Sequence, residues 1–297
     1  MDDFIQSLSD DSIYFIKGDK NARYPNSNSL LIGDYLIDTG VSGKVLKKVK
    51  KQHEINHVIL SHWHEDHLHG NYLFPNAIFY SHINDKPIIE DINKMIPFYK
   101  LEGMQIGEDL KNLLTYMKIK NTLIDKTIDG GDIFKIKEDI QFHVLHTPGH
   151  TAGHCTFHEP RSKIGFFGDI DLSKFPYYGN IDADLLKFEE SIDKLSKMDF
   201  DIVVTGHKGP IMGSQTIKEE LEKYRNVLNQ RDERILAFFN EGTPTTIEAL
   251  KKKNLIYKKY YYEEFEIIAE LLMIEKHIDK FLIQEVLISK ENGFILN

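Results

Sequence analysis

Short apolar runs alternate with polar, lysine-rich stretches along the first two-thirds of the chain. The lysine-rich stretch 45–54 has the spacing of an amphipathic helix, because its apolar positions recur on one side. The apolar runs have the length of buried strands, and residues that favour turns follow them. They lie at residues 55–60, 77–80, 140–145, 164–168 and 201–206. Strands that alternate with helices in this way predict an α/β fold.

The pattern becomes almost entirely helical after about residue 216. Thr216, with Glu219 three residues later, is typical of a capped helix start and predicts a helix that continues to Gln230. Further helices are expected at residues 231–240, at 247–253 behind a cap at Thr245 or Thr246, and at 267–281, followed by a hairpin of strands 285–288 and 294–296. We therefore expect two domains, residues 1–215 and 216–297.

Composition narrows the class of protein. The hydrophobic share of 41% and charged share of 28% are ordinary for a globular protein, and the apolar runs are far shorter than the ~18–20 residues that span a bilayer. The acidic start Met1-Asp2-Asp3 does not resemble a secretory signal, so we expect a cytoplasmic protein. The single cysteine, Cys155, excludes an internal disulfide and is interpreted as a small buried residue rather than a nucleophile. The net charge of −9 disfavours a general nucleic-acid binder, although a local basic patch stays compatible with it.

Four potential metal ligands are concentrated in the heptapeptide Ser-His-Trp-His-Glu-Asp-His at residues 61–67. His62, His64, Asp66 and His67 form the pattern His-x-His-x-Asp-His, and imidazole and carboxylate groups bind borderline transition metals. The cluster directly follows the strand predicted at 55–60, and α/β enzymes build their sites on the loops at strand ends. A solvated histidine-rich loop is the alternative, but the density of ligands favours a metal site.

Three later residues stand in equivalent positions, just past a predicted strand. They are His150 in the turn His-Thr-Pro-Gly-His-Thr after 140–145, Asp169 after 164–168, and His207 after 201–206. Asp171 competes with Asp169 for this place, and the Gly-Asp spacing favours Asp169. These positions predict that the ligands converge at one end of a sheet or sandwich.

The ordered series of these motifs resembles the metallo-β-lactamase superfamily. Residues 30–40, with their Asp-Thr-Gly turn, resemble its opening hairpin, and the likeness covers about residues 10–210. The resemblance implies a four-layer αβ/βα sandwich of two mixed sheets with helices outside. It also implies two divalent metal ions, one held by His62, His64 and His150 and the other by Asp66, His67 and His207, with Asp169 bridging them. Zinc suits these thiol-free ligands, and iron or manganese fits the same geometry.

Other residues are expected to support the ligands. In the superfamily an aspartate in the place of Asp38 supports the site from behind. His69, His146 and His154 flank ligands, and each is either a group that orients a ligand or an ordinary histidine in a turn.

Two segments are expected beside the site. Residues 86–125 predict helices inserted between the first ligands and His150, and they form either a lid or a surface helix pair that covers the sheet edge. The segment after Asp169 carries Tyr177 and Tyr178, which would either donate a hydrogen bond to a developing oxyanion or pack under the lid. A closed chamber would place Phe98, Tyr99, Met104 and Tyr178 against a bound substrate.

The resemblance implies a hydrolase in which a bridging hydroxide attacks the substrate and Asp66 orients that hydroxide. The run His-Thr-Pro-Gly-His-Thr is most similar to glyoxalase-II-like thioesterases and lactonases, so a small thioester, ester or lactone is the expected substrate. An RNA-cleaving phosphodiesterase is the alternative, and an iron enzyme of redox or sulfur chemistry is a third. Relatives that reduce oxygen at a diiron centre carry Glu where this chain has His64, which argues against that version.

The C-terminal order of helices and hairpin resembles a winged helix, as found in a branch of these hydrolases that includes a mitochondrial endoribonuclease. Lys258-Lys259 followed by three tyrosines is a pattern seen in single-strand binders. Residues 216–297 nevertheless contain 13 Lys and Arg against 15 Asp and Glu, so the attraction to phosphate is weak. We expect this part to shape the pocket or to form a homodimer contact rather than to bind nucleic acid, and we expect no membrane partner.

Overall fold

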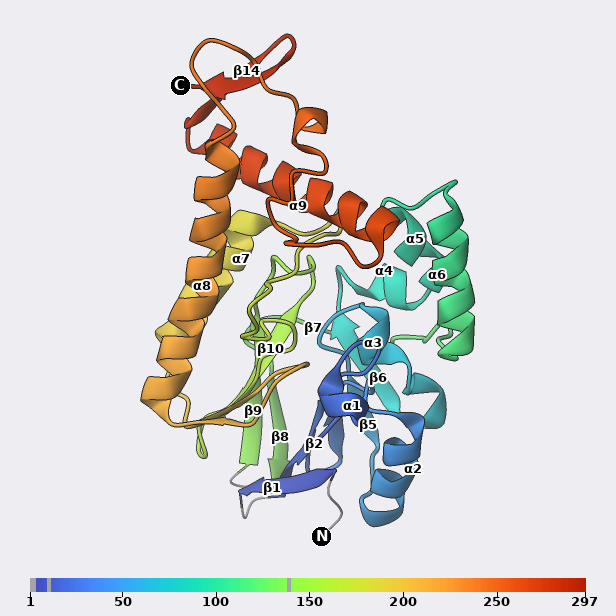
Figure 1. Cartoon of the computed structure of the whole chain (residues 1–297). Helices are drawn as coiled ribbons and strands as arrows, with labels where there is room; N and C mark the ends of the chain where they lie inside the picture. Colours follow the sequence, from blue (N-terminus) through green and yellow to red (C-terminus); the bar gives the residue numbers. More distant parts are fainter. Residues whose placement is uncertain (1–3, 10–11, 138–139) are drawn as a thin grey trace.

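The computed structural model describes residues 4–9, 12–137 and 140–297, and its strands form two large sheets and one hairpin within those ranges (Figure 1). The first sheet has the order β1 (Ile5–Ser9), β2 (Ile13–Ile16), β3 (Ser29–Ile32), β4 (Tyr35–Ile37), β5 (His57–Ile59), β6 (Ile78–His82), β7 (Lys126–Ile128). The second has the order β13 (Ile211–Met212), β12 (Ile202–Val204), β11 (Ile164–Phe166), β10 (Cys155–Glu159), β9 (Ile140–His146), β8 (Ile133–Lys137). Both sheets are mixed, because β4 to β7 are parallel, as are β11 and β12, while the remaining pairs are antiparallel.

Alternation along the strands explains the layers. In β2 the side chains of Ile13 and Phe15 belong to the apolar cluster between the sheets, whereas Ile16 belongs to the cluster under the outer helices. The cluster between the sheets also contains Phe142, Val144 and other residues of the second sheet. Cys155 is buried there, as expected for a small apolar residue.

Helices cover the outer faces of both sheets. Those packed on the first sheet are α2 (Gly43–Gln52), α4 (Lys86–Ile89), α5 (Met95–Phe98) and α6 (Gln105–Tyr116), and those on the second are α7 (Leu185–Ser196), α8 (Ser214–Leu236) and α9 (Glu263–Ile283). The four-layer αβ/βα sandwich expected from the sequence is confirmed. Short helical turns complete the described chain: α1 (Asp19–Ala22), α3 (Glu65–Leu68), η1 (Asn71–Leu73), η2 (Ile92–Lys94) and η3 (Glu248–Leu250).

The C-terminal part differs from the prediction in its helices. Residues 216–230 and 231–240 were predicted as two helices, but α8 runs unbroken from Ser214 to Leu236, because its sequence contains neither Pro nor Gly to end the first one. The predicted third helix is reduced to η3, where the hydroxyl of Thr246 accepts the N–H of Ala249. The hairpin is present as β14 (Leu287–Lys290) and β15 (Gly293–Leu296). A winged helix stays a prediction for this part of the chain.

The C-terminal helices share their core with the second sheet. A single apolar cluster joins side chains of α8 and α9 to those of α7 and to Phe167 and Val203. Figure 1 shows α9 crossing above α7 towards α5. Apolar packing is therefore continuous across residue 215, and the division into two domains at that residue stays a prediction.

None of the helices in the described ranges is both long and apolar enough to cross a membrane. The acidic start Met1-Asp2-Asp3, on which the expected absence of a secretory signal rests, lies outside the described residues.

Candidate metal centre

Seven predicted ligands come together at one end of the two sheets. His62 and His64 follow β5, and Asp66 and His67 belong to the single turn of α3. The other three follow strands of the second sheet: His150 comes after β9, Asp169 after β11 and His207 after β12. They form two groups in which ligand atoms lie within 4.8 Å of one another, His62, His64, His150 with Asp169, and Asp66, His67 with His207.

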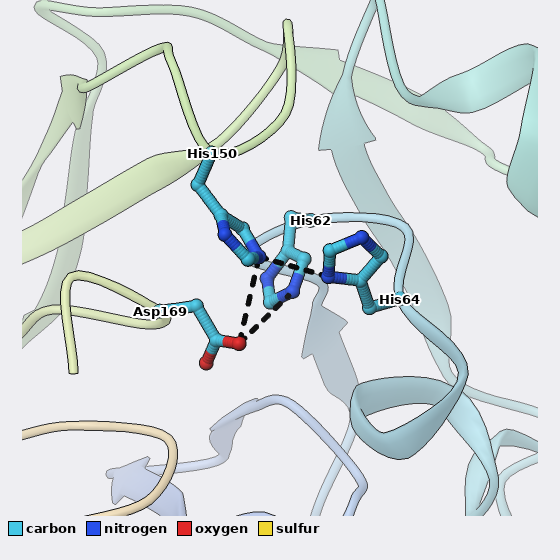
Figure 2. Close-up of side chains that lie close together, drawn as sticks. All are labelled: His62, His64, His150 and Asp169. Carbon is cyan, nitrogen blue, oxygen red and sulfur yellow. Dashed lines mark hydrogen bonds and ion pairs between the residues drawn. The ribbon is translucent and has the colours of Figure 1, made fainter. Parts of the chain in front are cut away.

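The first group consists of three imidazoles and one carboxylate (Figure 2). The Nε2 atom of His150 lies 2.8 Å from Nδ1 of His64 and 3.5 Å from Oδ2 of Asp169. The Nε2 atom of His62 lies 3.8 Å from the same carboxylate oxygen. All three histidines are almost fully buried, so the centre is shielded from bulk water.

Asp169 also faces the second group, through its other oxygen. Its Oδ1 atom lies 3.0 Å from Nε2 of His67 and 3.5 Å from Nε2 of His207. The Nε2 atom of His207 is in turn 3.3 Å from Oδ2 of Asp66. One carboxylate thus presents one oxygen to each group, which is the geometry of a bridging ligand.

In four of the histidine ligands, the protein holds the ring nitrogen that points away from the centre. Nδ1 of His67 lies 2.7 Å from the carboxylate of Asp38, and Nδ1 of His62 lies 3.0 Å from the hydroxyl of Ser61. For the other two, the acceptors are backbone carbonyls: Nδ1 of His150 donates to Tyr177 and Nδ1 of His207 donates to Ala22. When Nδ1 carries the hydrogen and donates it, the neutral ring has its lone pair on Nε2, which is the atom that faces the centre.

Unsatisfied atoms show that the site fits a cation. The buried side-chain atoms of the described residues that have no hydrogen-bond partner include Nε2 of His62, Nε2 of His67 and Oδ1 of Asp169, all of which face the centre. Buried polar atoms are normally satisfied, so a cluster of unsatisfied lone pairs that converge from two sheets indicates a ligand that accepts them. The donor set of imidazole and carboxylate is that of a divalent transition metal.

The charges of the two groups differ. Burial lowers the pKa of His62 and His64 well below the usual value, which keeps both imidazoles neutral. Burial alone would also lower the pKa of His67, but the carboxylates of Asp169, Asp38 and Asp66 outweigh it and raise this pKa to about 10. The second group is therefore a place that favours positive charge.

Backbone conformation at Asp38 aims its carboxylate. Asp38 has φ of 60°, a left-handed conformation that is uncommon outside glycine. Its two oxygens accept the N–H and the hydroxyl of Ser61 as well as facing His67, each at 2.7 Å. The expected supporting role of this aspartate agrees with these contacts.

The segment that carries these ligands also carries a likeness to known proteins. Residues 23–207, which include all seven ligands, match the family described as the metallo-beta-lactamase superfamily. The chain belongs to this superfamily. It is 24% identical over 246 residues to a beta-lactamase-like protein 2 homolog of Drosophila melanogaster, covering 78% of this chain and 75% of that protein. It is 26% identical over 124 residues to a hydroxyacylglutathione hydrolase of Buchnera aphidicola, covering 41% of this chain and 37% of that enzyme.

Solved structures of the superfamily share the whole fold. A beta-lactamase domain protein from Burkholderia ambifaria superimposes with a TM-score of 0.71 at 14% identity, over 99% of this chain and 93% of that one. A metallo-beta-lactamase family protein from Thermus thermophilus gives a TM-score of 0.67 at 16% identity, over 96% of this chain and 93% of that one. Because these likenesses extend past residue 215, the C-terminal helices are included in them.

The predicted oxyanion donors are engaged elsewhere in the structure. The hydroxyl of Tyr178 lies 2.7 Å from Nε2 of His277, and its ring is buried in the apolar cluster of α7, α8 and α9. The prediction that Tyr178 contacts an oxyanion or a substrate was therefore wrong. Tyr177 does reach the centre, with its ring centroid 5.9 Å from that of His64, but its hydroxyl donates to the carbonyl of Gly179.

Residues 86–125 lie beside the centre, as the lid interpretation requires. The ring of Tyr99 is stacked on that of His64 with a centroid distance of 5.7 Å, and Phe98 meets Trp63 edge-on. The carbonyl of Phe98 also accepts the N–H of Ile181 from the segment after Asp169. Met104, which was expected near a substrate, is 40% exposed at the start of α6.

A buried carboxylate beside the ligands was given no role by the sequence. Glu65, between His64 and Asp66, accepts hydrogen bonds of 2.8 Å from the hydroxyls of Tyr24 and Tyr99. Burial and Asp66 raise the pKa of Glu65 above its usual value. Its place inside the ligand motif was the available signal, but its two partners come from segments far from it in sequence.

The flanking residues play different parts. His154 lies behind Asp169, whose N–H donates to His154 Nε2 at 3.0 Å, and His69 Nε2 donates to the carbonyl of Gly40. Asp171 accepts the N–H of Ser173 instead of joining the ligands. His146 stacks on His82, and with Asp129 they form a third group of close potential ligands. The backbone N–H of Asn84 donates to Nδ1 of His82, which keeps the proton of that ring on Nε2, the atom facing Asp129, and makes it a donor rather than a metal ligand.

Proposed function

We propose that this chain is a hydrolase with a binuclear metal centre that cleaves a small thioester, ester or lactone. The observation that carries the proposal is the orientation of Asp169, which presents one oxygen to His62 and His150 and the other to His67 and His207. Two divalent ions held there, most suitably zinc, would polarise a carbonyl oxygen and lower the pKa of a trapped water towards neutrality.

The chain itself supplies the orientation of the ligands. His62, His64 and His150 would hold one ion, and Asp66, His67 and His207 the other, with Asp169 shared. Each ring whose Nδ1 is bound by Ser61, Asp38, Tyr177 or Ala22 keeps its Nε2 free and aimed at the centre. Orientation of this kind stabilises the reacting geometry before the substrate arrives. Asp66 would bind metal and orient the attacking water.

The surroundings of His64 support a small acyl substrate. Tyr99 from the inserted helices stacks on its imidazole, and Tyr177 from the segment after Asp169 and Trp63 meet the ring edge-on. The hydrogen bond from Ile181 N–H to the Phe98 carbonyl joins the segment after Asp169 to the inserted helices beside His64. An aromatic enclosure excludes water and strengthens the electrostatic field at a reacting carbonyl, whereas a folded RNA would need an open, basic groove. The hydroxyacylglutathione hydrolase among the relatives supports the same substrate class.

The proposal is tested with purified protein that has been reconstituted with zinc, iron or manganese in separate samples. We expect two metal ions per chain by elemental analysis and turnover of thioesters or lactones in a panel that also contains phosphodiesters and RNA. His62→Ala and Asp169→Ala should abolish turnover while circular dichroism stays unchanged. One ion per chain or none would refute the binuclear centre, and RNA cleavage that exceeds all other turnover and disappears in His62→Ala would replace the proposed substrate class.

A further inference from the structure

A buried arginine in α8 has an unusual environment. The side chain of Arg231 is 1% exposed, and among the described residues its guanidinium contacts a backbone carbonyl, a methionine sulfur and two aromatic rings rather than a carboxylate. Burial of a charge without a counter-ion is unfavourable unless other groups compensate for it. The groups that offset the burial of this charge must lie against the guanidinium, and Arg231 in turn holds them in place.

Those groups belong mainly to one short segment. The guanidinium donates a hydrogen bond of 2.6 Å from Nη1 to the carbonyl of Pro176. It also lies over the rings of Phe175 and Tyr178, 4.7 and 5.3 Å from their centroids. Contacts of a guanidinium with aromatic faces are favourable and strengthen when water is excluded. Arg231 thus contacts the first residue of segment 175–178 through Phe175, its backbone through the Pro176 carbonyl, and its last residue through Tyr178.

One residue inside this segment touches a predicted metal ligand. The carbonyl of Tyr177 accepts a hydrogen bond of 2.8 Å from Nδ1 of His150, and this bond fixes which nitrogen of that ring is free. The free atom, Nε2 of His150, faces Asp169 and His64. The carbonyl of Tyr177 belongs to the peptide between Tyr177 and Tyr178, which is flanked by the two groups that Arg231 contacts, the Pro176 carbonyl and the Tyr178 ring. A displacement of that peptide would therefore turn the imidazole of His150 away from the centre.

A second set of contacts anchors the segment to the C-terminal helices. The hydroxyl of Tyr178 meets Nε2 of His277 in α9, and Nδ1 of His277 lies 2.6 Å from the carboxylate of Asp232 in α8. Lys280 joins Asp232 to Glu189 of α7 with distances of 2.6 Å to each carboxylate. These contacts join α8 and α9 to segment 175–178 and to α7, and so fix the place of the helix that carries Arg231.

We propose that Arg231 is a positioning residue for the metal centre: it fixes the carbonyl of Tyr177, which orients His150, and so lets the C-terminal helices set the metal affinity of the first group. The inference rests on the proposed metal centre but not on the proposed substrate. It assigns to the C-terminal part of the chain a role in metal binding rather than in nucleic-acid recognition.

The test compares Arg231→Met with Arg231→Lys and with Arg234→Met in the full chain. Methionine keeps most of the volume but removes the charge and the donor, whereas lysine keeps a charge and a donor without the planar contact to two rings. Arg234 is an exposed arginine of the same helix whose Nε donates to the carbonyl of Gln230, so its replacement controls for a change in helix charge. Zinc affinities of both sites are measured by competition with a chelator, and the absorption spectrum of the cobalt-substituted protein reports on ligand geometry.

We expect Arg231→Met to weaken the site formed by His62, His64 and His150 by about 10- to 100-fold, the size of effect that follows loss of a group supporting a ligand, and to change the cobalt spectrum. Arg231→Lys should recover part of that affinity, and Arg234→Met should match the wild type. Equal affinities and spectra in wild type and Arg231→Met, with only a lower melting temperature, would overturn the inference. If Arg231→Met does not fold, Arg231→Lys decides, because unchanged affinity there overturns the inference and a weakened single site supports it. A wild-type chain that binds no metal would instead refute the proposed function.

Discussion

We expect replacement of Asp38 by asparagine to weaken one of the two proposed metal sites and to leave the other nearly unchanged. The carboxylate of Asp38 is fully buried and accepts from Ser61 N–H through one oxygen, while its other oxygen meets both the Ser61 hydroxyl and Nδ1 of His67. Asparagine has the same shape but replaces one oxygen with a donor. If the amide nitrogen faces His67, that ring must carry its proton on Nε2, the atom required for the metal. If the amide is turned round, its nitrogen opposes the N–H of Ser61.

Either orientation therefore loses one hydrogen bond to a charged group. Such a bond contributes about 1.5–3 kcal/mol, so Asp38→Asn should reduce affinity for the ion held by His67 by roughly 10- to 150-fold. The ion held by His62, His64 and His150 should be bound almost as before, because none of these rings contacts Asp38: Nδ1 of His62 lies against the Ser61 hydroxyl, Nδ1 of His150 against the Tyr177 carbonyl, and Nδ1 of His64 against Nε2 of His150.

Stepwise zinc titration against a chelator measures both constants in the same sample. Asp125→Asn is a matched control, because the carboxylate of Asp125 also accepts a backbone N–H, from Phe79, at a place away from the ligands. Unchanged affinity of both sites in Asp38→Asn would refute the reasoning about the His67 tautomer. Equal weakening of both sites would show that Asp38 supports the local fold rather than one ligand.

Three further outcomes are expected. Metal uptake at pH 7 should release protons, because the pKa of His67 is raised from 6.5 to about 10 in the metal-free protein, and a binding enthalpy that does not depend on the buffer would contradict this. In the metal-free protein, the stability contributed by protonated His67 is complete below pH 6.5 and is lost as the pH rises through about 10. Gly206→Ala should lower metal content, since its Cβ would lie 2.5 Å from Oδ1 of Asp169, whereas Gly242→Ala, whose Cβ would come no closer than 3.7 Å to the side chain of Asn240, should keep both ions. Tyr99→Phe should reduce the free energy of unfolding by about 1–3 kcal/mol in denaturant titrations, because Glu65 loses one of its two donors, and a wild-type value would count against this.

The sandwich and the place of the ligands could be predicted because local signals carry them. Each apolar run that precedes a ligand forms a strand, as at β5 before His62 and β12 before His207. The ligand at a strand end then needs no long-range information, since the turn after the strand decides its direction. The opening hairpin of β3 and β4 likewise ends in the turn that carries Asp38.

The positions that prediction missed depend on contacts between distant segments. Tyr178 is close to Asp169 in sequence, yet its ring points into the cluster formed by α7, α8 and α9, which nothing local to residues 169–180 reveals. Arg231 looks like one more exposed charge of a polar helix until the segment 175–178 is packed against it. The boundary predicted at Gln230 was wrong for a different reason, since no helix-ending residue occurs there.

The division of the ligands between the two sheets has a consequence for how the protein is made. His62, His64, Asp66 and His67 leave the ribosome well before His207, the last ligand along the chain. The first sheet and its helices can pack while the second is still being synthesised, but the first group of ligands is complete only after β9 and β11 have docked, and the second only after β12 has docked. Closing so long a loop costs entropy that only the finished interface between the sheets offsets. The proposed metal ions would therefore be bound firmly only after the two sheets have docked, so that metal loading would be a late event in biosynthesis and a reporter of completed folding.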